Sequence, residues 1–278
     1  MMTKKIISFQ GMEGAYSELV CKKFYKSYMP LPCNTFQKTL DVVTNGKAEL
    51  AMIPVENNIA GRVADMHFLL ENVKLKVVAE YYQKIEHCLL TKKKNSMNNI
   101  TKVLSHSHAL GQCKKNIKKL NLIAVQFMDT AGAAKFVKEN NDNELSAIAS
   151  TLAAKIYNLK ILKKDFADKK ENITRFLVFS KKSNELSIKG KIITSIVFNT
   201  KNIPAALYNA LGGFAKNGIN LTRLESFFVN KDFKQFSFII DVESHPDLND
   251  FKYAIKVLKR YSTRVRILGF YKASSFRK

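Results

Sequence analysis

Apolar and polar positions follow a repeating order along the first 180 residues of the chain. A short apolar run comes first, then a polar tip, then a segment with apolar residues at helical spacing, and such runs are typical of buried strands. Pro54 is expected to stop the hydrogen-bond ladder of its strand, because proline donates no ladder hydrogen bond. The expected strands are Ile6–Phe9, Leu50–Asn58 (ending in a polar tip), Leu75–Tyr82, Ile85–Leu90, Val103–His106, Ala124–Phe127, Leu145–Ala149 and Leu159–Leu162.

Helices are expected between most of these strands. The repeating order of strand, tip and helix predicts an α/β architecture with parallel sheets. The polar tips then share the side where strands end and helices begin, which predicts a cleft between two α/β lobes. The expected helices are 17–28, Thr35–Val43, Ala64–Leu70, Ala109–Leu120, Ala131–Lys138 (capped by Asp129 and Thr130) and 151–157.

The pattern changes after a polar segment, Lys181–Lys191, which is a candidate linker. The remainder predicts a βαββαβ unit, which often pairs edge to edge with another copy. Its expected elements are strand Ile192–Phe198, helix Ala205–Asn217, strands Ile219–Val229 and Phe233–Val242, helix Leu248–Lys259 and strand Arg264–Phe270.

Composition adds a strong positive charge. The 278 residues carry a formal net charge of +23, mostly from lysine, which favours anionic partners such as nucleic acid or a small substrate with several carboxylates. The lysines are scattered, and neither a zinc-finger spacing nor an aromatic-basic motif of the RNA-binding type is present. We therefore interpret the charge as a solvated surface that steers substrate weakly.

Cysteine and histidine spacings suggest no metal site and no disulfide framework. The four cysteines form no CxxC pair and are expected to be reduced thiols of a cytoplasmic protein. No HExxH motif is present. No run of about 18 apolar residues and no signal-peptide core is seen, so no membrane contact is expected.

The hexapeptide Glu171–Phe176 is the strongest candidate for chemistry. It places Asn172, Thr174, Arg175 and Phe176 at the start of an apolar run, Leu177–Phe179. Ligands bind at strand ends in open α/β sheets. The alternative is a strand edge with one surface threonine and one surface arginine.

Other polar tips have both a functional and a structural interpretation. The Gly11–Gly14 turn before a helix is either an anion site or an ordinary turn that needs glycine. Glu56–Asn58 either binds substrate or bonds its own backbone. His106 and His108 are candidate general bases, although a lone histidine is more often a capping or packing residue.

Five motifs in one order resemble the prephenate dehydratase family with a C-terminal ACT regulatory domain. The resemblance covers nearly the whole chain, and no one motif is specific alone. The motifs are Phe9–Glu18, Pro54–Asn57, Ser105–Cys113, Asp168–Phe176 and Gly218–Ser226.

The resemblance implies a two-lobed, periplasmic-binding-protein-like α/β catalytic domain plus a βαββαβ ferredoxin-like ACT domain. The chain would cross between the lobes near Tyr81–His87 and near Asp168–Thr174. The implied boundaries are 1–182 for the catalytic domain (lobe one about 1–82 plus 170–182, lobe two about 83–169) and 191–278 for the ACT domain.

The implied reaction converts prephenate to phenylpyruvate, water and carbon dioxide in L-phenylalanine biosynthesis, with no cofactor and no metal. The resemblance assigns Thr174 as hydrogen-bond donor or relay to the departing hydroxide. Arg175 would hold a carboxylate or orient the site, and Phe176 would keep it dry. The implied substrate-binding residues are Asn57, Ser105, Gln112, Thr130 and Asn172.

The C-terminal motifs depart from the family pattern. Gly-Ala-Leu and Glu-Ser-Arg-Pro are usual, whereas this chain has Ala205-Ala206-Leu207 and Glu225-Ser226-Phe227-Phe228. L-Phenylalanine is the implied effector and a homodimer or homotetramer the implied assembly. The candidate effector-binding residues are Ala205, Ala206, Leu207, Asn220, Leu221, Glu225 and Ser226.

Departures in the catalytic motifs leave the substrate open. Asn58 stands where a small hydroxyl residue is usual, and Ser107-His108 replaces a Pro-Gln pair. Arogenate is therefore an alternative substrate. A non-catalytic small-molecule sensor and a nucleic-acid-binding protein are the rival classes, and the intact Thr174-Arg175-Phe176 argues against the sensor.

Overall fold

A computed structural model describes residues 5–187, 190–228 and 236–277 of the chain. Two compact units are present: residues 1–62 with 82–176, and residues 63–81 with 177–278. The second unit thus takes in residues 63–81, which the expected boundaries place in lobe one. Those boundaries stay a prediction, and each unit is described by itself.

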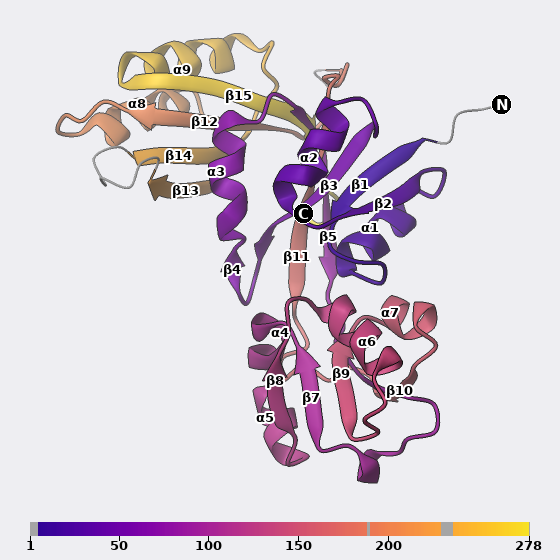
Figure 1. The fold of residues 1–278 in the computed structure, drawn as a ribbon. Helices are drawn as coiled ribbons and strands as arrows, with labels where there is room; N and C mark the ends of the chain where they lie inside the picture. The colour runs from indigo at the N-terminus through magenta and orange to yellow at the C-terminus, as the bar shows by residue number, and fades with distance from the viewer. Residues whose placement is uncertain (1–4, 188–189, 229–235, 278) are drawn as a thin grey trace. The chain divides into compact units, whose positions relative to one another are not determined.

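Lobe one of the first unit is built on parallel strands. Ser8 pairs with Ala51 on one side and with Leu31 on the other, so β1 lies between β3 and β2. The strand order of this part is β11-β3-β1-β2, with β4 beside β3. The elements are β1 (Ile6–Gln10), α1 (Tyr16–Phe24), β2 (Met29–Cys33), α2 (Phe36–Thr44), β3 (Leu50–Asn57) and β4 (Gly61–Arg62) (Figure 1).

Prolines account for two features of this lobe. The ladder between β3 and β1 ends at Met52, before Pro54, while β3 itself continues to Asn57. The first helix stops at Phe24 instead of residue 28, and β2 follows with Pro30 and Pro32. β2 ends the strand order given above, and edge strands tolerate proline.

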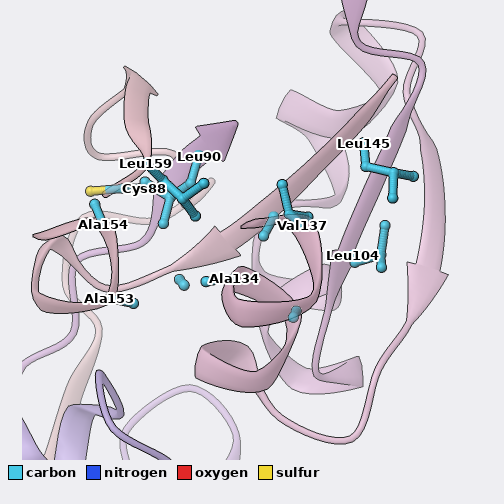
Figure 2. Packing of buried hydrophobic residues seen from close by; sticks show 12 residues of the cluster. Cys88, Leu90, Leu104, Ala134, Val137, Leu145, Ala153, Ala154 and Leu159 are labelled. Atoms are coloured by element: carbon cyan, nitrogen blue, oxygen red, sulfur yellow. The ribbon is translucent and has the colours of Figure 1, made fainter. Parts of the chain in front are cut away.

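The inner strands of the lobe two sheet (β6, β9 and β7) are buried on both faces, whereas the outer strands β8 and β10 are mostly exposed or half-buried. Alternate residues of its strands point to opposite faces, so Leu90 and Leu104 pack on α6 and α7 (Figure 2) while Leu89 and Val103 pack on α4 and α5. The elements are β6 (Cys88–Thr91), η1 (Met97–Asn99), β7 (Lys102–Ser105), α4 (Ser107–Gln112), α5 (Lys114–Lys119), β8 (Ile123–Gln126), α6 (Thr130–Glu139), β9 (Leu145–Ala149), α7 (Thr151–Ile156) and β10 (Lys160–Lys163).

Lobe two corrects two further expectations. Its sheet, with order β10-β6-β9-β7-β8, is mixed: β6 runs antiparallel to both β9 and β10, because the chain enters this lobe through β6 without a preceding crossover helix. The helix expected over Ala109–Leu120 is two short helices that meet at Cys113.

The chain crosses between the lobes twice, as expected. β5 (Lys76–Lys84) leads towards lobe two and β11 (Ile173–Ser180) leads back. The backbone N–H of Ile85 donates to the carbonyl of Asn172 at 2.7 Å, so the two crossings lie side by side.

The second unit contains the predicted βαββαβ order. Its helices cover one face of an antiparallel sheet with order β13-β14-β12-β15, where Phe198, Phe214, Ile240 and Phe251 form the core. The elements are α3 (Ala64–Asn72), β12 (Ile192–Thr200), α8 (Ala206–Lys216), β13 (Leu221–Phe228), β14 (Phe236–Glu243), α9 (Asn249–Arg260) and β15 (Ser262–Lys272).

The predicted fold class is confirmed: two α/β lobes and a βαββαβ unit. Expected residues 229 and 233–235 lie outside the described part of the chain. All four cysteines are buried free thiols. Among the described residues, no helix is long and apolar enough to span a bilayer.

Candidate functional site

Asn57, the last residue of β3, is held in one orientation by the turn that follows it. Its side-chain oxygen accepts the backbone N–H groups of Ile59 (3.0 Å) and Ala60 (2.7 Å). An amide whose oxygen takes two N–H donors must direct its NH₂ group the other way. The turn therefore fixes Asn57 as a donor towards the first residues of β11.

Thr174 receives that donor. The Asn57 amide nitrogen lies 2.9 Å from the Thr174 hydroxyl oxygen and donates to it. The hydroxyl hydrogen is donated to none of the described residues. Thr174 is 9% exposed. Asn57 thus orients the threonine hydroxyl as an acceptor, and donation of its hydrogen to a bound molecule stays a prediction.

Asn172 and Gln112 extend the same arrangement into lobe two. Asn57 donates to the Asn172 side-chain oxygen at 2.7 Å, and Asn172 donates to the Gln112 side-chain oxygen at 2.9 Å. The Gln112 amide nitrogen donates to none of the residues that the structure describes. Four of the predicted residues are therefore joined by hydrogen bonds, from both lobes.

Arg175 and Phe176 lie behind this group. The Arg175 guanidinium is 3% exposed and donates to Glu56 at 3.0 Å, so it forms a buried ion pair beside Asn57. Phe176 is buried. Because Arg175 is already paired with Glu56, this geometry fits the expected orienting role better than direct contact with a substrate carboxylate. The roles of Arg175 and Phe176 stay predictions.

A cavity of about 380 Å³ opens beside Gln112. Lys115 and Lys169 line it, as does Asp168, whose two carboxylate oxygens accept the backbone N–H groups of Lys115 (2.9 Å) and Asn116 (3.1 Å). The remaining lining residues are Ile59, Ala60, Ser107, His108 and Gly111. The cavity thus offers amide and ammonium donors, and its one carboxylate is already bonded.

Two predicted substrate-binding residues are not joined to this group. Ser105 is buried and donates its hydroxyl to the carbonyl of Ile148 at 2.6 Å, which links strands β7 and β9. Thr130 begins α6, which Asp129 caps by accepting the N–H of Gly132 at 2.7 Å. Neither contacts Asn57 or Gln112 through a hydrogen bond, so substrate contact by either stays a prediction.

Side chains and backbone groups at three polar tips are held by hydrogen bonds within the protein, and any functional role of these tips stays a prediction. The Gly14 N–H is taken by the buried Glu18 carboxylate at 2.6 Å, so the glycine turn satisfies its own donor. Asn58 joins two backbone segments, donating to Glu171 and accepting from Ile173, both at 2.8 Å. His106 accepts the backbone N–H of His108, which is capping geometry. Burial lowers the pKa of His106, with His108 adding to this effect.

Sequence reasoning missed Tyr16 and His87. His87 is buried, and its Nε2 lies 2.8 Å from the Gln112 side-chain oxygen while its Nδ1 lies 2.8 Å from the Tyr16 hydroxyl. Tyr16 lies in the Phe9–Glu18 motif, where it was given no role, and His87 lies outside the five motifs. Their link to the site is visible only once the lobes are brought together.

The candidate effector residues lie around the start of α8 and along β13. Ala205 adopts a left-handed backbone conformation (φ 57°) as the residue before the helix. Asn220 donates to Glu243 at 3.1 Å, and Glu225 accepts from Arg223 at 3.1 Å. Ala206 and Leu207 open the helix, and Leu221 and Ser226 lie on the strand; their effector role stays a prediction.

Known proteins are similar to this chain over most of its length. A bifunctional N-acyl-homoserine lactone acylase/prephenate dehydratase of Komagataeibacter europaeus is 41% identical over 279 residues, 100% of this chain and 99% of that protein. Arogenate dehydratase/prephenate dehydratase 2 of Arabidopsis thaliana, a chloroplastic protein, is 34% identical over 95% of this chain and 72% of its own length.

Among solved structures, prephenate dehydratase from Arthrobacter aurescens in complex with L-Phe superposes with a TM-score of 0.87 at 26% identity, covering 96% of this chain and 90% of that one. The family model described as prephenate dehydratase matches residues 7–184, well over half of the chain. The chain therefore belongs to the prephenate dehydratase family of lyases.

Proposed function

We propose that this chain converts prephenate to phenylpyruvate, water and carbon dioxide, as a step of L-phenylalanine biosynthesis. The observation that carries the proposal is the Thr174 hydroxyl, which accepts a hydrogen bond from Asn57 and keeps its own hydrogen for a bound molecule. A departing hydroxyl group needs a donor of this kind.

The chemistry requires donors and little else. The bond between the ring and its carboxylate breaks, and its electron pair moves into the ring. The ring becomes aromatic as the C–OH bond breaks, and the leaving hydroxide takes a proton to become water. Thr174 donates a hydrogen bond or relays that proton, while Arg175 and its partner Glu56 keep Asn57 and Thr174 in place. Positioned proton transfer contributes roughly 10²- to 10⁴-fold to rate.

The lining of the cavity favours prephenate over arogenate. Arogenate carries an ammonium group where prephenate has a keto group. Lys115 and Lys169 repel an ammonium group, and the Asp168 carboxylate is already engaged by the backbone of α5. Prephenate instead presents two carboxylates and a keto oxygen, which are acceptors for the Gln112 amide and the two lysines.

Regulation by L-phenylalanine is the second part of the proposal. The βαββαβ unit has the order of an ACT domain, and the relative from Arthrobacter aurescens binds L-Phe. We place the effector near Ala205 and Asn220, where the start of α8 and the start of β13 carry the family's motif positions.

The test is phenylpyruvate formation from prephenate by wild type, Thr174→Ala and Thr174→Ser, with and without L-phenylalanine. We expect the alanine variant to lose roughly 10²- to 10⁴-fold in kcat. The serine variant keeps the hydroxyl and should keep most of the rate. Circular dichroism establishes that each variant is folded.

Further arms separate the alternatives. Arogenate is expected to give a lower kcat/KM than prephenate. Substrate binding without turnover by folded wild type would favour a sensor and overturn the dehydratase proposal. Hydrolysis of an N-acyl-homoserine lactone is measured separately, because the relative from Komagataeibacter europaeus carries that activity in its name. If Thr174→Ala lost both activities, they would share one site.

A further inference from the structure

Two side chains, the half-buried Tyr16 and the buried His87, continue the series of hydrogen bonds beyond the residues that the proposed mechanism uses. Tyr16 comes from α1 of lobe one, and His87 from the start of lobe two. The His87 ring lies between the Tyr16 hydroxyl and the Gln112 amide, 2.8 Å from each. The rings of Tyr16 and His87 also pack edge to face, with centroids 5.6 Å apart.

The turn after β3 determines which group donates and which accepts in the hydrogen bonds that run from Asn57 to Gln112. Because the Asn57 oxygen accepts two backbone N–H groups, its nitrogen donates, and the Asn172 oxygen is an acceptor. The Asn172 nitrogen must then be the donor to Gln112, whose oxygen is an acceptor. Gln112 is thereby oriented with its oxygen inward.

The same logic sets the tautomer of His87. Its Nε2 faces the Gln112 oxygen, which can only accept, so Nε2 carries a hydrogen. In a neutral imidazole, Nδ1 is then an acceptor, and the Tyr16 hydroxyl shares its one hydrogen between Nδ1 at 2.8 Å and the Glu86 carbonyl oxygen at 3.0 Å. Burial lowers the pKa of His87, although the hydrogen bond with Gln112 opposes this effect, and burial raises the pKa of Tyr16 well above its ordinary value. Both groups are therefore neutral near pH 7.

We propose that His87 is a positioning residue that, with Tyr16 behind it, holds the Gln112 amide so that its NH₂ group faces the cavity. The oxygen of Gln112 then accepts two donors, one from Asn172 and one from His87. An anionic substrate meets a hydrogen-bond donor rather than a carbonyl oxygen. The inference rests on the proposed dehydratase function.

The alternative is that His87 contributes only to packing between the lobes. A double-mutant cycle distinguishes the two, because residues that act through one group are not additive. His87→Phe removes the donor and keeps an aromatic ring. Gln112→Met removes the amide and keeps the length of the side chain. If His87 acts through Gln112, the double variant is no slower than Gln112→Met alone.

We expect His87→Phe to lower kcat/KM roughly ten- to a hundredfold, the range for a buried acceptor that loses its donor. His87→Gln, whose amide nitrogen can occupy the place of Nε2, should restore most of the activity. His87→Asn, which is too short to reach Gln112, should not. Tyr16→Phe removes one oxygen, tests the same chain with little risk to folding, and should also be non-additive with Gln112→Met.

The outcomes separate the two proposals. Additive losses for both His87→Phe and Tyr16→Phe with Gln112→Met would overturn the positioning role while wild type still turns over prephenate. Equal activity of His87→Gln and His87→Asn would overturn it as well. Inactive wild type would overturn the dehydratase proposal first, and the positioning role with it.

Discussion

Ala205 holds a backbone conformation that alanine adopts at a cost. Its φ of 57° is in the left-handed region, which costs an L-residue roughly 1–2 kcal/mol. Glycine avoids this strain, but it has more conformational freedom in the unfolded state, so folding costs it about 0.5–1 kcal/mol more entropy than alanine. We therefore expect Ala205→Gly to raise the free energy of unfolding by about 0.5–1 kcal/mol, measured by denaturant titration.

Ala206 provides the control for this prediction. It is the first residue of α8 and is buried, so Ala206→Gly should lower the free energy of unfolding by about 1 kcal/mol.

Ala205→Gly also recreates the usual Gly-Ala-Leu motif, and inhibition by L-phenylalanine should then occur at lower concentration. A loss of stability in Ala205→Gly would contradict the proposed strain.

The site was predictable at residue scale where a motif marks it. The Thr-Arg-Phe run and the Glu56–Asn58 tip pointed to Thr174 and Asn57, and the structure joins them. His87 was not predictable in the same way. Its role depends on whether the oxygen or the nitrogen of the Gln112 amide faces it. That orientation is set through Asn57 by two backbone N–H groups in the turn after β3, some thirty residues from His87 in sequence.

At the scale of elements, the turn between β1 and α1 connects lobe one to lobe two by hydrogen bonds. The Gly14 carbonyl accepts the Ser150 hydroxyl at 2.6 Å, and the Glu13 carbonyl accepts the Tyr157 hydroxyl at 2.7 Å. A Cβ atom on Gly14 would lie 2.8 Å from the Cα of Ala153 in α7. This turn therefore needs glycine both for its φ of 90° and for its close approach to α7.

Gly14→Ala should therefore destabilise the protein more than Gly61→Ala. Gly61 has a similar φ of 80°, but a Cβ atom there meets nothing within 4 Å. The backbone term is about 1–2 kcal/mol for both variants, and the overpacking term of about 1–3 kcal/mol applies to Gly14 alone. Thermal unfolding of the two variants beside wild type gives the difference, and equal shifts would show that α7 moves aside without cost.

Periodicity predicted most elements, and its failures have local causes. Apolar runs located the strands of both lobes, because buried strands need continuous apolar residues. The edge strand Met29–Cys33 was missed, since its two prolines resemble a loop. The antiparallel direction of β6 was missed because the alternation of strands and helices carries no sign of which way the chain enters a lobe.

For the whole molecule, the open question is whether the net charge of +23 assists the reaction. Screening limits the reach of each charge to a Debye length, about 8 Å at physiological ionic strength. Lys169 lines the cavity, whereas Lys93 is an exposed residue between β6 and β7. At physiological ionic strength, only lysines that line the cavity, such as Lys169, should then act on bound prephenate, which is a dianion.

Lys169→Gln is therefore expected to lower kcat/KM for prephenate several-fold at about 0.15 M salt, mainly through KM, and the matched Lys93→Gln to leave it unchanged. Near 0.01 M salt the Debye length is about 30 Å, so Lys93→Gln should begin to lower kcat/KM as well. Steady-state kinetics of both variants across this salt range would make the comparison. Equal losses at 0.15 M would mean that the lysine-rich surface acts as a whole, by steering, and that the cavity lysines hold no special place in substrate capture.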